Sequence, residues 1–359
     1  MNKELRKKSC LLLLEFGIPH YRIFIYQYFQ EKFNEFKIIH SGEIFDHNEV
    51  FKNKKCWNLK LFRGISICVF NFFQIKNYDI IISTLNFRKP HTWIPFFIFC
   101  RKKWIFWGQG VGKNNRNIFL RYLRKVIINH SSGYVVYTDS GKRKLIQSGI
   151  KEEKISIAYN TLRIKNSVIT SGNNYLLYVG RIQKRKGLIK VLQAITDTRY
   201  KFVIVGDGKY GEILKQFVES HDLTNQVFFR PAIYDENELK IIFSDAIAYI
   251  SPDHVGLGVV HSFAYGVPII TCQNRYHAPE IEYCNISNSY LYQNDNELKS
   301  VIEEVFNNPK KRNIKGKNAY LFYKNKLDPE NVYKAFDYHF DRINTLSVNT
   351  GSDKFINNL

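Results

Sequence analysis

The sequence lacks an uninterrupted apolar run of the ~18–20 residues that a membrane-spanning helix needs. Basic residues precede a short apolar run at 10–14, but no small-residue cleavage site follows, so we expect a first β-strand there rather than a signal peptide. None of the six cysteines forms a C-x-x-C pair, and several stand inside apolar runs. This pattern argues against structural zinc and favours buried thiols in a reducing, cytoplasmic setting.

Three motifs of nucleotide and acyl chemistry are also missing. The chain has no D-x-D, the usual carboxylate pair that holds a metal-nucleotide complex. It has neither G-x-x-x-x-G-K-[ST] nor G-x-S-x-G, so P-loop and α/β-hydrolase interpretations lose support.

Acidic residues are scarce in the first half of the chain. Residues 1–165 hold 30 Lys and Arg against 11 Asp and Glu, a net of +19, and residues 166–359 hold 23 against 21, a net of +2, which together give +21. Such asymmetry indicates nucleic acid, an anionic membrane surface or an anionic substrate as a partner. Aromatic residues interleaved with basic ones at 93–107 fit a membrane interface or, as the local pattern favours, a buried strand, a basic turn and a second strand.

The 359 residues exceed what one hydrophobic core usually holds, and expected strands alternate with helices along the chain. Residues 162–174 are polar and interrupt the alternation, which predicts a linker. We therefore expect an α/β protein of two doubly wound domains, 1–165 and 166–330, followed by a helix and polar tail at 331–359.

One stretch in the second half has the form of a binding site. An expected strand at 246–250 is followed by a glycine-bearing loop and a helix over 259–265, which Gly266 ends. Glycine and a helix N-terminus admit an anion at close range. Asp253 and His261 flank the loop and could face one pocket; the alternative is a capping aspartate and a packed histidine.

Two further loops follow strands. Arg181 and Lys186 stand beside an expected helix start after the strand 175–179, where they could clamp a diphosphate, although a solvated basic turn has the same pattern. Residues 206–211 form a full G-x-G-x-x-G, but the next strand ends in Arg230 rather than an acidic residue, which argues against a dinucleotide cofactor.

In the first half, His20 and Arg22 follow the first expected strand, where sites of α/β proteins open; a packed loop histidine is the alternative.

Taken in order, these motifs resemble the family 4 glycosyltransferases of the GT-B fold. The resemblance covers roughly residues 135–285 and rests on Tyr159-Asn160-Thr161, Gly180-Arg181, Lys186-Gly187, Gly206-Asp207-Gly208, Ser251-Pro252, Gly266-Val267-Pro268 and Pro279-Glu280. It implies two Rossmann-like domains that face each other across a cleft, with a final helix crossing back.

The resemblance also implies a donor site for a nucleotide diphosphate sugar. Arg181 and Lys186 would carry the diphosphate in place of a metal, so that no cofactor is needed, and Asp253 would approach the sugar hydroxyls. The implied donor-binding set is Gly180, Arg181, Lys186, Gly206, Gly208, Asp253, His254, Val255, Gly256, Leu257, His261 and Glu280. The implied acceptor-side set is Gly17, His20, Arg22 and Gln109. The family's glutamate pair falls on Asp253 and His261, and this departure matters because a histidine cannot accept a bidentate contact from a ribose.

The resemblance implies a retaining, metal-independent hexosyltransferase (EC 2.4 class), and we expect it to act in bacterial surface-polysaccharide synthesis, such as lipopolysaccharide or capsule. It would move a sugar to a hydroxyl of a glycan, lipid-linked in our expectation, and bind no nucleic acid. The basic half would hold it, as a peripheral protein, against the anionic inner face of the cytoplasmic membrane. Two alternatives stay open at this point: a non-catalytic nucleic-acid-binding protein that uses the +19 half, and a nicotinamide oxidoreductase.

Overall fold

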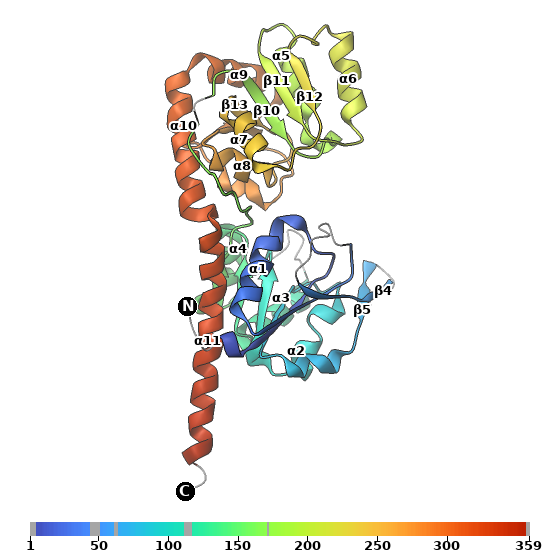
Figure 1. The fold of residues 1–359 in the computed structure, drawn as a ribbon, viewed down its shortest axis with the longest axis vertical. Coiled ribbons are helices and arrows are strands. Elements are labelled where there is room, and N and C mark those ends of the chain that lie inside the picture. The colour runs from blue at the N-terminus through green and yellow to red at the C-terminus, as the bar shows by residue number, and fades with distance from the viewer. Residues whose placement is uncertain (1–4, 44–50, 61–63, 111–116, 171, 357–359) are drawn as a thin grey trace. The chain divides into compact units, whose positions relative to one another are not determined.

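A computed structural model describes residues 5–43, 51–60, 64–110, 117–170 and 172–356. The chain forms two compact units: Met1–Tyr159 together with Pro329–Leu359, and Asn160–Asp328 (Figure 1). The sequence analysis placed its boundaries after residues 165 and 330.

The first unit is built on a parallel sheet in the order β3-β2-β1-β6-β7-β8-β9. Its strands are β1 (Ser9–Leu13), β2 (Glu35–His40), β3 (Lys52–Lys55), β6 (Ile80–Ser83), β7 (Trp104–Gly108), β8 (Gly133–Val136) and β9 (Ile155–Ile157). Strand order reverses between β1 and β6, so this sheet has a switch point at its centre, where ligands of open α/β sheets bind.

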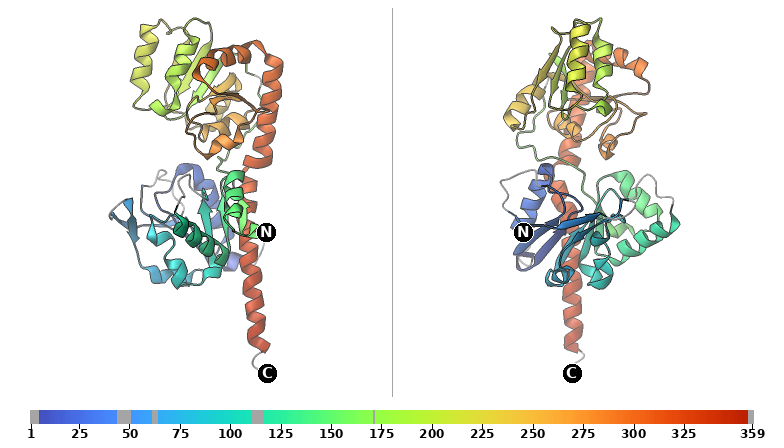
Figure 2. Two further views of the ribbon diagram at one scale, coloured as in Figure 1. Left: turned by 180° about the vertical axis from the view of Figure 1, so that it is seen from behind. Right: turned by 90° about the vertical axis from the view of Figure 1, so that its right-hand side faces the viewer.

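Helices cover both faces of this sheet (Figure 2). On one face α1 (Ile23–Lys32) packs against α11 (Pro329–Ile356), where the ring of Phe29 lies 4.9 Å from that of Phe336 and 5.9 Å from that of Phe340. The last helix thereby belongs to the core of the first unit. The other face carries α2 (Pro95–Ile98) and α3 (Ile118–His130), and α4 (Asp139–Gln147) follows β8.

Most expected elements of this unit exist, but residues 93–100 do not form the expected strand. Pro95 opens a single helical turn, α2, because its missing N–H is no loss at a first helical position. The edge strand β3 and the antiparallel pair β4 (Trp57–Lys60) and β5 (Ser66–Val69) were not predicted. β3 and β4 are largely exposed and contain lysine, so they lack the apolar alternation that identifies a strand, and β5 is only four residues long.

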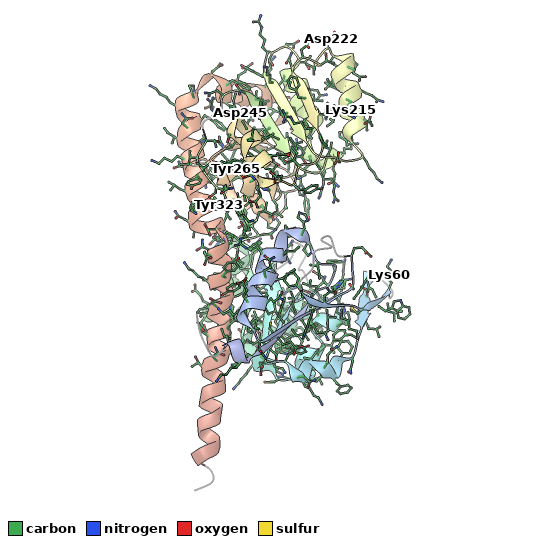
Figure 3. The ribbon with its side chains drawn as sticks, viewed as in Figure 1. Lys60, Lys215, Asp222, Asp245, Tyr265 and Tyr323 are labelled. Atoms are coloured by element: carbon green, nitrogen blue, oxygen red, sulfur yellow. A yellow bond between two sulfur atoms is a disulfide. The ribbon has the colours of Figure 1, made fainter. Side chains whose placement is uncertain are left out.

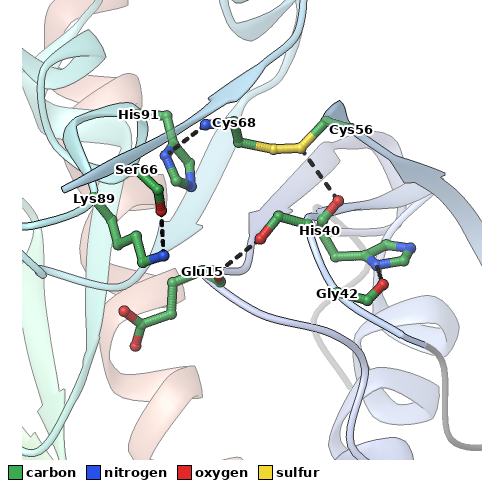
Figure 4. The surroundings of a disulfide bond; sticks show 9 residues. Glu15, His40, Gly42, Cys56, Ser66, Cys68, Lys89 and His91 are labelled. Carbon is green, nitrogen blue, oxygen red and sulfur yellow. Dashed lines mark hydrogen bonds between the residues drawn. A yellow bond between two sulfur atoms is a disulfide. The ribbon is translucent and has the colours of Figure 1, made fainter. Parts of the chain in front are cut away.

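A disulfide joins Cys56 to Cys68 beside the β4–β5 pair (Figure 4). Cys56 Sγ lies 3.2 Å from the carbonyl oxygen of His40, and the backbone N–H of Cys68 donates to His91 Nδ1 at 3.1 Å. The expectation of buried thiols is therefore wrong for this pair, because antiparallel pairing brings together cysteines that are 12 positions apart. Cys10, Cys100, Cys272 and Cys284 are free.

The second unit is built on a parallel sheet in the order β12-β11-β10-β13-β14-β15. Its strands are β10 (Tyr175–Val179), β11 (Lys201–Val205), β12 (Val227–Arg230), β13 (Ala246–Ile250), β14 (Ile269–Cys272) and β15 (Ser289–Tyr292). Its helices are α5 (Leu188–Ile195), α6 (Gly211–Ser220), α7 (Glu236–Ser244), α8 (Gly258–Ala264), α9 (Leu298–Asn307) and α10 (Pro309–Phe322).

Local sequence sets the ends of these helices. Asp235 caps α7 by accepting hydrogen bonds from the backbone N–H groups of Asn237 and Glu238. A π-helical turn, η11 (Tyr323–Leu327), follows α10, and Tyr323 and Tyr265, labelled in Figure 3, are both fully buried in this unit. No helix of the described residues is long and apolar enough to cross a bilayer.

Short helical turns complete both units. They are η1 (Leu5–Lys7), η2 (His20–Arg22), η4 (Phe72–Asn77), η5 (Pro90–Thr92), η6 (Arg101–Lys103), η7 (Glu152–Lys154), η8 (Lys184–Lys186), η9 (Pro279–Tyr283) and η10 (Asp295–Glu297).

Candidate functional site

Three loops meet at the carboxyl edge of the second sheet, after β10, β11 and β13. A Cβ on Gly206 would lie 2.1 Å from the carbonyl oxygen of Gly180, and one on Gly208 would lie 2.0 Å from that of Ile182. The backbone N–H of Ile182 donates to the carbonyl of Asp207 at 2.8 Å. The G-x-G pattern therefore lets the β10 and β11 loops touch backbone to backbone, which explains these glycines without a dinucleotide.

Lys186 reaches from η8 to the loop after β13. Its Nζ donates to the carbonyl of His254 at 2.9 Å, and a Cβ on Gly256 would lie 3.7 Å from the same Nζ. Burial, with help from the charge of Arg185, lowers the pKa of Lys186 to about 8, although Glu280 acts in the opposite direction. An ammonium held in this way gains from an anion that binds beside it.

Arg181, by contrast, is exposed. Its side chain makes no hydrogen bond or ion pair anywhere in the described ranges, while its carbonyl accepts a hydrogen bond from Tyr178 at 2.9 Å. The guanidinium is therefore available to a ligand at the edge where the β10 loop begins.

Asp253 lies at the centre of an ion-pair network. Its Oδ1 contacts Lys190 Nζ at 2.7 Å and Arg275 Nε at 3.0 Å, and Asp295 bridges the same two cations at 3.0 and 2.7 Å. Its other oxygen lies against Gly187, where φ is +73° and a Cβ would approach it to 2.7 Å. The carboxylate is thus neutralised and fixed in position, with its side chain 21% exposed.

His254 lies in the loop after β13, where its carbonyl oxygen accepts the hydrogen bond from Lys186 Nζ. Burial, then the charges of Lys186 and Arg185, lower the pKa of His254 to about 4, so its ring is neutral at pH 7. The N–H of Val255 donates to His277 Nδ1 at 2.9 Å, and Gly256 and Leu257 then lead into α8.

His261 and Glu280 both follow this loop in the chain, on α8 and η9. The ring of His261, on α8, stacks on Phe243 with centroids 6.0 Å apart, and burial lowers its pKa to about 4. It is therefore a neutral donor or acceptor and does not replace a carboxylate in charge. Glu280, on η9, is buried and accepts a hydrogen bond from Asn160 at 2.6 Å.

In the first unit, a cavity of about 730 Å³ opens beyond the carboxyl ends of β1, β6, β7 and β8. This position at the strand-order switch is where α/β sheets bind ligands. Gly17, Arg22 and Gln109 line the cavity, whereas His20 is exposed on η2 and lies outside the lining.

Arg22 is held inside this cavity by aromatic rings. Its Nη2 donates to the hydroxyl of Tyr137 at 2.6 Å, and its guanidinium carbon lies 4.4 Å from the centre of the Trp107 ring. Gly17 allows the loop after β1 to pass the backbone of Glu43, because a Cβ there would lie 1.8 Å from that carbonyl oxygen. Gly17, Arg22 and Gln109 therefore lie around one cavity at this strand edge, and their acceptor-side role stays a prediction.

Several polar residues of both sites were not expected from the sequence. They are Arg185, Lys190, Arg275 and Asp295 in the second unit and Glu15, Asn86, Arg88, Arg124, Tyr134 and Tyr137 in the first. Of these residues, Arg124 could have been recognised from the sequence as facing the protein interior, because it interrupts the apolar stripe of α3 formed by Leu120, Ile127 and Ile128.

Comparison with known proteins finds a family match within the second unit. Residues 161–322 match the family model Glycosyl transferases group 1. The chain is 23% identical over 227 residues to the O-antigen chain mannosyltransferase C of Escherichia coli, a match that spans 60% of this chain and 61% of that protein. The matched region is thus less than two thirds of that relative's length.

Solved structures with a similar fold cover nearly all of the chain. The crystal structure of Anabaena Alr3699/HepE in complex with UDP superposes with a TM-score of 0.68 at 15% identity, covering 95% of this chain and 100% of that one. The apo form of the lipopolysaccharide outer core galactosyltransferase WaaB superposes with a TM-score of 0.63 at 13% identity, covering 92% and 99%.

The predicted fold, two Rossmann-like α/β domains as in GT-B glycosyltransferases, is therefore confirmed. The match of residues 161–322 to the glycosyl transferases group 1 model agrees with the predicted enzyme class, and the name of the Escherichia coli relative refers to O-antigen synthesis. The alternative of a nucleic-acid-binding protein is not favoured.

Proposed function

We propose that this protein transfers a sugar from a nucleotide diphosphate sugar to a hydroxyl of a surface glycan, with retention at the anomeric carbon and without a metal. The observation that carries the proposal is Lys186, a partly buried ammonium held against the loop after β13 and beside Gly256. Arg181 is exposed on the same loop after β10, so two cations stand at the strand edge where the resemblance implies a donor.

The chemistry follows from charge. As the bond between the sugar and the diphosphate breaks, negative charge grows on the leaving phosphate, and fixed cations stabilise that charge in a partly dry site. Arg181 forks onto phosphate oxygens and Lys186 adds a point charge, so together they supply the stabilisation that a divalent metal supplies elsewhere. Asp253, fixed by Lys190 and Arg275, keeps the loop after β13 in position and offers its exposed edge to sugar hydroxyls.

The remaining donor residues have supporting roles in this proposal. Gly180, Gly206 and Gly208 keep the loops in contact, and the segment His254–Leu257 lies along the sugar and diphosphate. His261 donates one hydrogen bond to ribose or phosphate, and Glu280 with Asn160 supports the floor of the site.

The test is thermal unfolding of the full chain against UDP-, GDP-, ADP- and CMP-sugars in the presence of EDTA. We expect one nucleotide to raise the melting temperature, and Arg181→Ala to remove that shift. Arg199→Ala, an exposed arginine between α5 and β11 at the opposite edge of the same sheet, is the matched control and keeps the shift. A shift that requires a divalent metal, or that survives in Arg181→Ala, contradicts the proposed clamp.

We also propose that the first unit binds a lipid-linked acceptor at an anionic membrane. On α3, Ile118, Phe119 and Tyr122 are 78%, 69% and 66% exposed, beside the exposed Lys125. Exposed apolar side chains beside basic ones suit the headgroup boundary of a bilayer.

Co-sedimentation with phosphatidylcholine vesicles, with and without phosphatidylglycerol, tests this membrane contact. Phe119→Ser should lose binding to the anionic vesicles, whereas Ile314→Ser, which changes a 63% exposed residue of the second unit, should retain it. Equal loss in both variants, or no preference for anionic vesicles, would refute the assignment of this face. The anomeric configuration of the product, read by NMR coupling constants, decides retention.

A further inference from the structure

The cavity of the first unit contains a buried guanidinium without an anion. Arg124 is only 9% exposed, and its Nε and Nη1 have no hydrogen-bond partner. Among the residues that the structure describes, no carboxylate pairs with it. Arginine stays protonated in proteins, so a buried and unpaired guanidinium is costly unless a ligand supplies the missing charge.

The surroundings of Arg124 strengthen this point. Arg22 and Arg88 line the same cavity, and Nε of Arg22 also lacks a partner. Glu15 is the one carboxylate among the described lining residues, and it is already engaged by Asn86, whose amide donates to it. Three cations against one occupied carboxylate leave this cavity with an excess of two positive charges.

The size of the cavity indicates a ligand larger than a bare ion. Its volume of about 730 Å³ is that of a site for an organic ligand. The guanidinium of Arg124 lies 5.1 Å from the ring centre of Phe87, which also lines the cavity and holds the arginine's plane in place. A fixed guanidinium plane suits the two oxygens of a carboxylate or phosphate.

We propose that this cavity recognises an oxyanion, a carboxylate or a phosphate, that the glycan acceptor carries, and that Arg124 is the residue that selects it. The inference rests on the proposed function, because it takes the cavity to be the acceptor subsite. Arg22 and Arg88 supply further positive charge, and the hydroxyl of Tyr134, which accepts a hydrogen bond from the N–H of Gly110 at 3.3 Å, adds a polar group on the same wall. An acceptor without the anion leaves the Arg124 guanidinium unpaired and binds more weakly.

Ligand-observed NMR titrations of the full chain test this proposal with three probes. Methyl β-glucuronide carries a carboxylate, glucose 1-phosphate carries a phosphate, and methyl β-glucoside is neutral. We expect one anionic probe to bind at least about tenfold more tightly than the neutral one, since a charge-assisted hydrogen bond is worth that much. The phosphate arm is repeated in Arg181→Ala, so that binding at the donor loops is not mistaken for binding here.

Two arginines of one helix make a matched pair of variants. Arg124→Met should reduce the preference to about twofold or less, whereas Arg121→Met, exposed on the same helix, should leave it unchanged. Arg124→Lys keeps the positive charge but cannot contact two oxygens in one plane, so it should lose part of the preference for the anionic probe. This variant replaces Arg124→Met in the test if the methionine variant does not fold. Equal binding of all three probes, or a preference that persists in Arg124→Met, overturns the inference.

The donor experiment separates the two proposals. If a nucleotide sugar stabilises the protein through Arg181 but no anionic probe is preferred, the inference about Arg124 fails and the proposed function stands. If an anionic probe is preferred through Arg124 but no nucleotide sugar binds, the anion site is supported and the glycosyltransferase function is refuted.

Discussion

The affinity for the donor should depend on pH, because the Lys186 amine has a pKa of about 8 and loses its charge between pH 7 and 9. The charge of the donor diphosphate changes little in that range. Burial and Arg185 lower this pKa to about 8 in the ligand-free protein, and its ammonium points at the carbonyl of His254. Only the protonated amine attracts a diphosphate. The charged fraction is about 0.9 at pH 7 and about 0.1 at pH 9, which follows from the pKa alone.

The affinity for the donor should therefore fall as pH rises from 7 to 9. If the ammonium contributes about 2 kcal/mol to binding, as hydrogen bonds to charged groups do, the dissociation constant rises by about an order of magnitude. Binding at pH 8 should also take up about half a proton, because the bound phosphate raises the pKa of Lys186 again.

Isothermal titration calorimetry at pH 7, 8 and 9, in buffers of different ionisation enthalpy, measures both quantities. The ligand is the nucleotide sugar that stabilises the protein in the thermal panel. Lys186→Met should bind weakly and with little pH dependence, whereas Lys184→Met, an exposed lysine of the same turn, should behave as the native protein. A dissociation constant that is constant from pH 7 to 9, or a pH dependence equally strong in Lys186→Met, would refute the reasoning.

Two predictions concern stability. Gly187→Ala should cost about 1–3 kcal/mol in urea unfolding, because φ is +73° and the new Cβ would approach Asp253 to 2.7 Å, whereas Gly211→Ala, with no atom within 4 Å, should be nearly neutral; equal costs would contradict the packing argument. Burial lowers the pKa of His339 to about 3. The unfolded chain therefore binds a proton at His339 near pH 6.5, whereas the native state does not bind it until about pH 3. The free energy of unfolding should decrease as the pH is lowered from about 6.5 to about 3. His339→Gln can still bond to Ser156 and should reduce this slope by up to about 1.4 kcal/mol per pH unit; an unchanged slope would rule out this source.

The sequence was sufficient for most of the regular elements of the second unit. The strands at 175–179, 201–205 and 227–230 are short apolar runs bounded by glycine or charge, and the structure has them with the same ends. Burial on both faces of a parallel sheet explains the first two runs, whereas the run at 227–230 is an edge strand in which only Val227 is buried. Strand β15 was missed because Ser289–Tyr292 is short and mixes serine with tyrosine, so that only its neighbour β14 makes it a strand.

Site geometry was less predictable than the elements that carry it. The position of Lys186 at a strand edge follows from the order of motifs, but its contact with His254 joins residues 68 positions apart. The same holds for Asp253, whose partner Lys190 lies 63 positions away in the chain. Distances of this kind come from the crossing of two loops, and no local pattern encodes them.

The charge of the first half shows why composition alone could not identify a ligand. Residues 1–165 carry a net +19, yet only three arginines, at positions 22, 88 and 124, line the described cavity. The exposed lysines of the same half are screened by salt and hydrated, so they bind any anionic surface weakly. Arg124 differs from Arg121 in burial rather than in charge, and burial is what makes an absent anion costly. Selectivity for an acceptor should therefore depend on the buried arginine, and adhesion to a membrane on the exposed residues of the same helix.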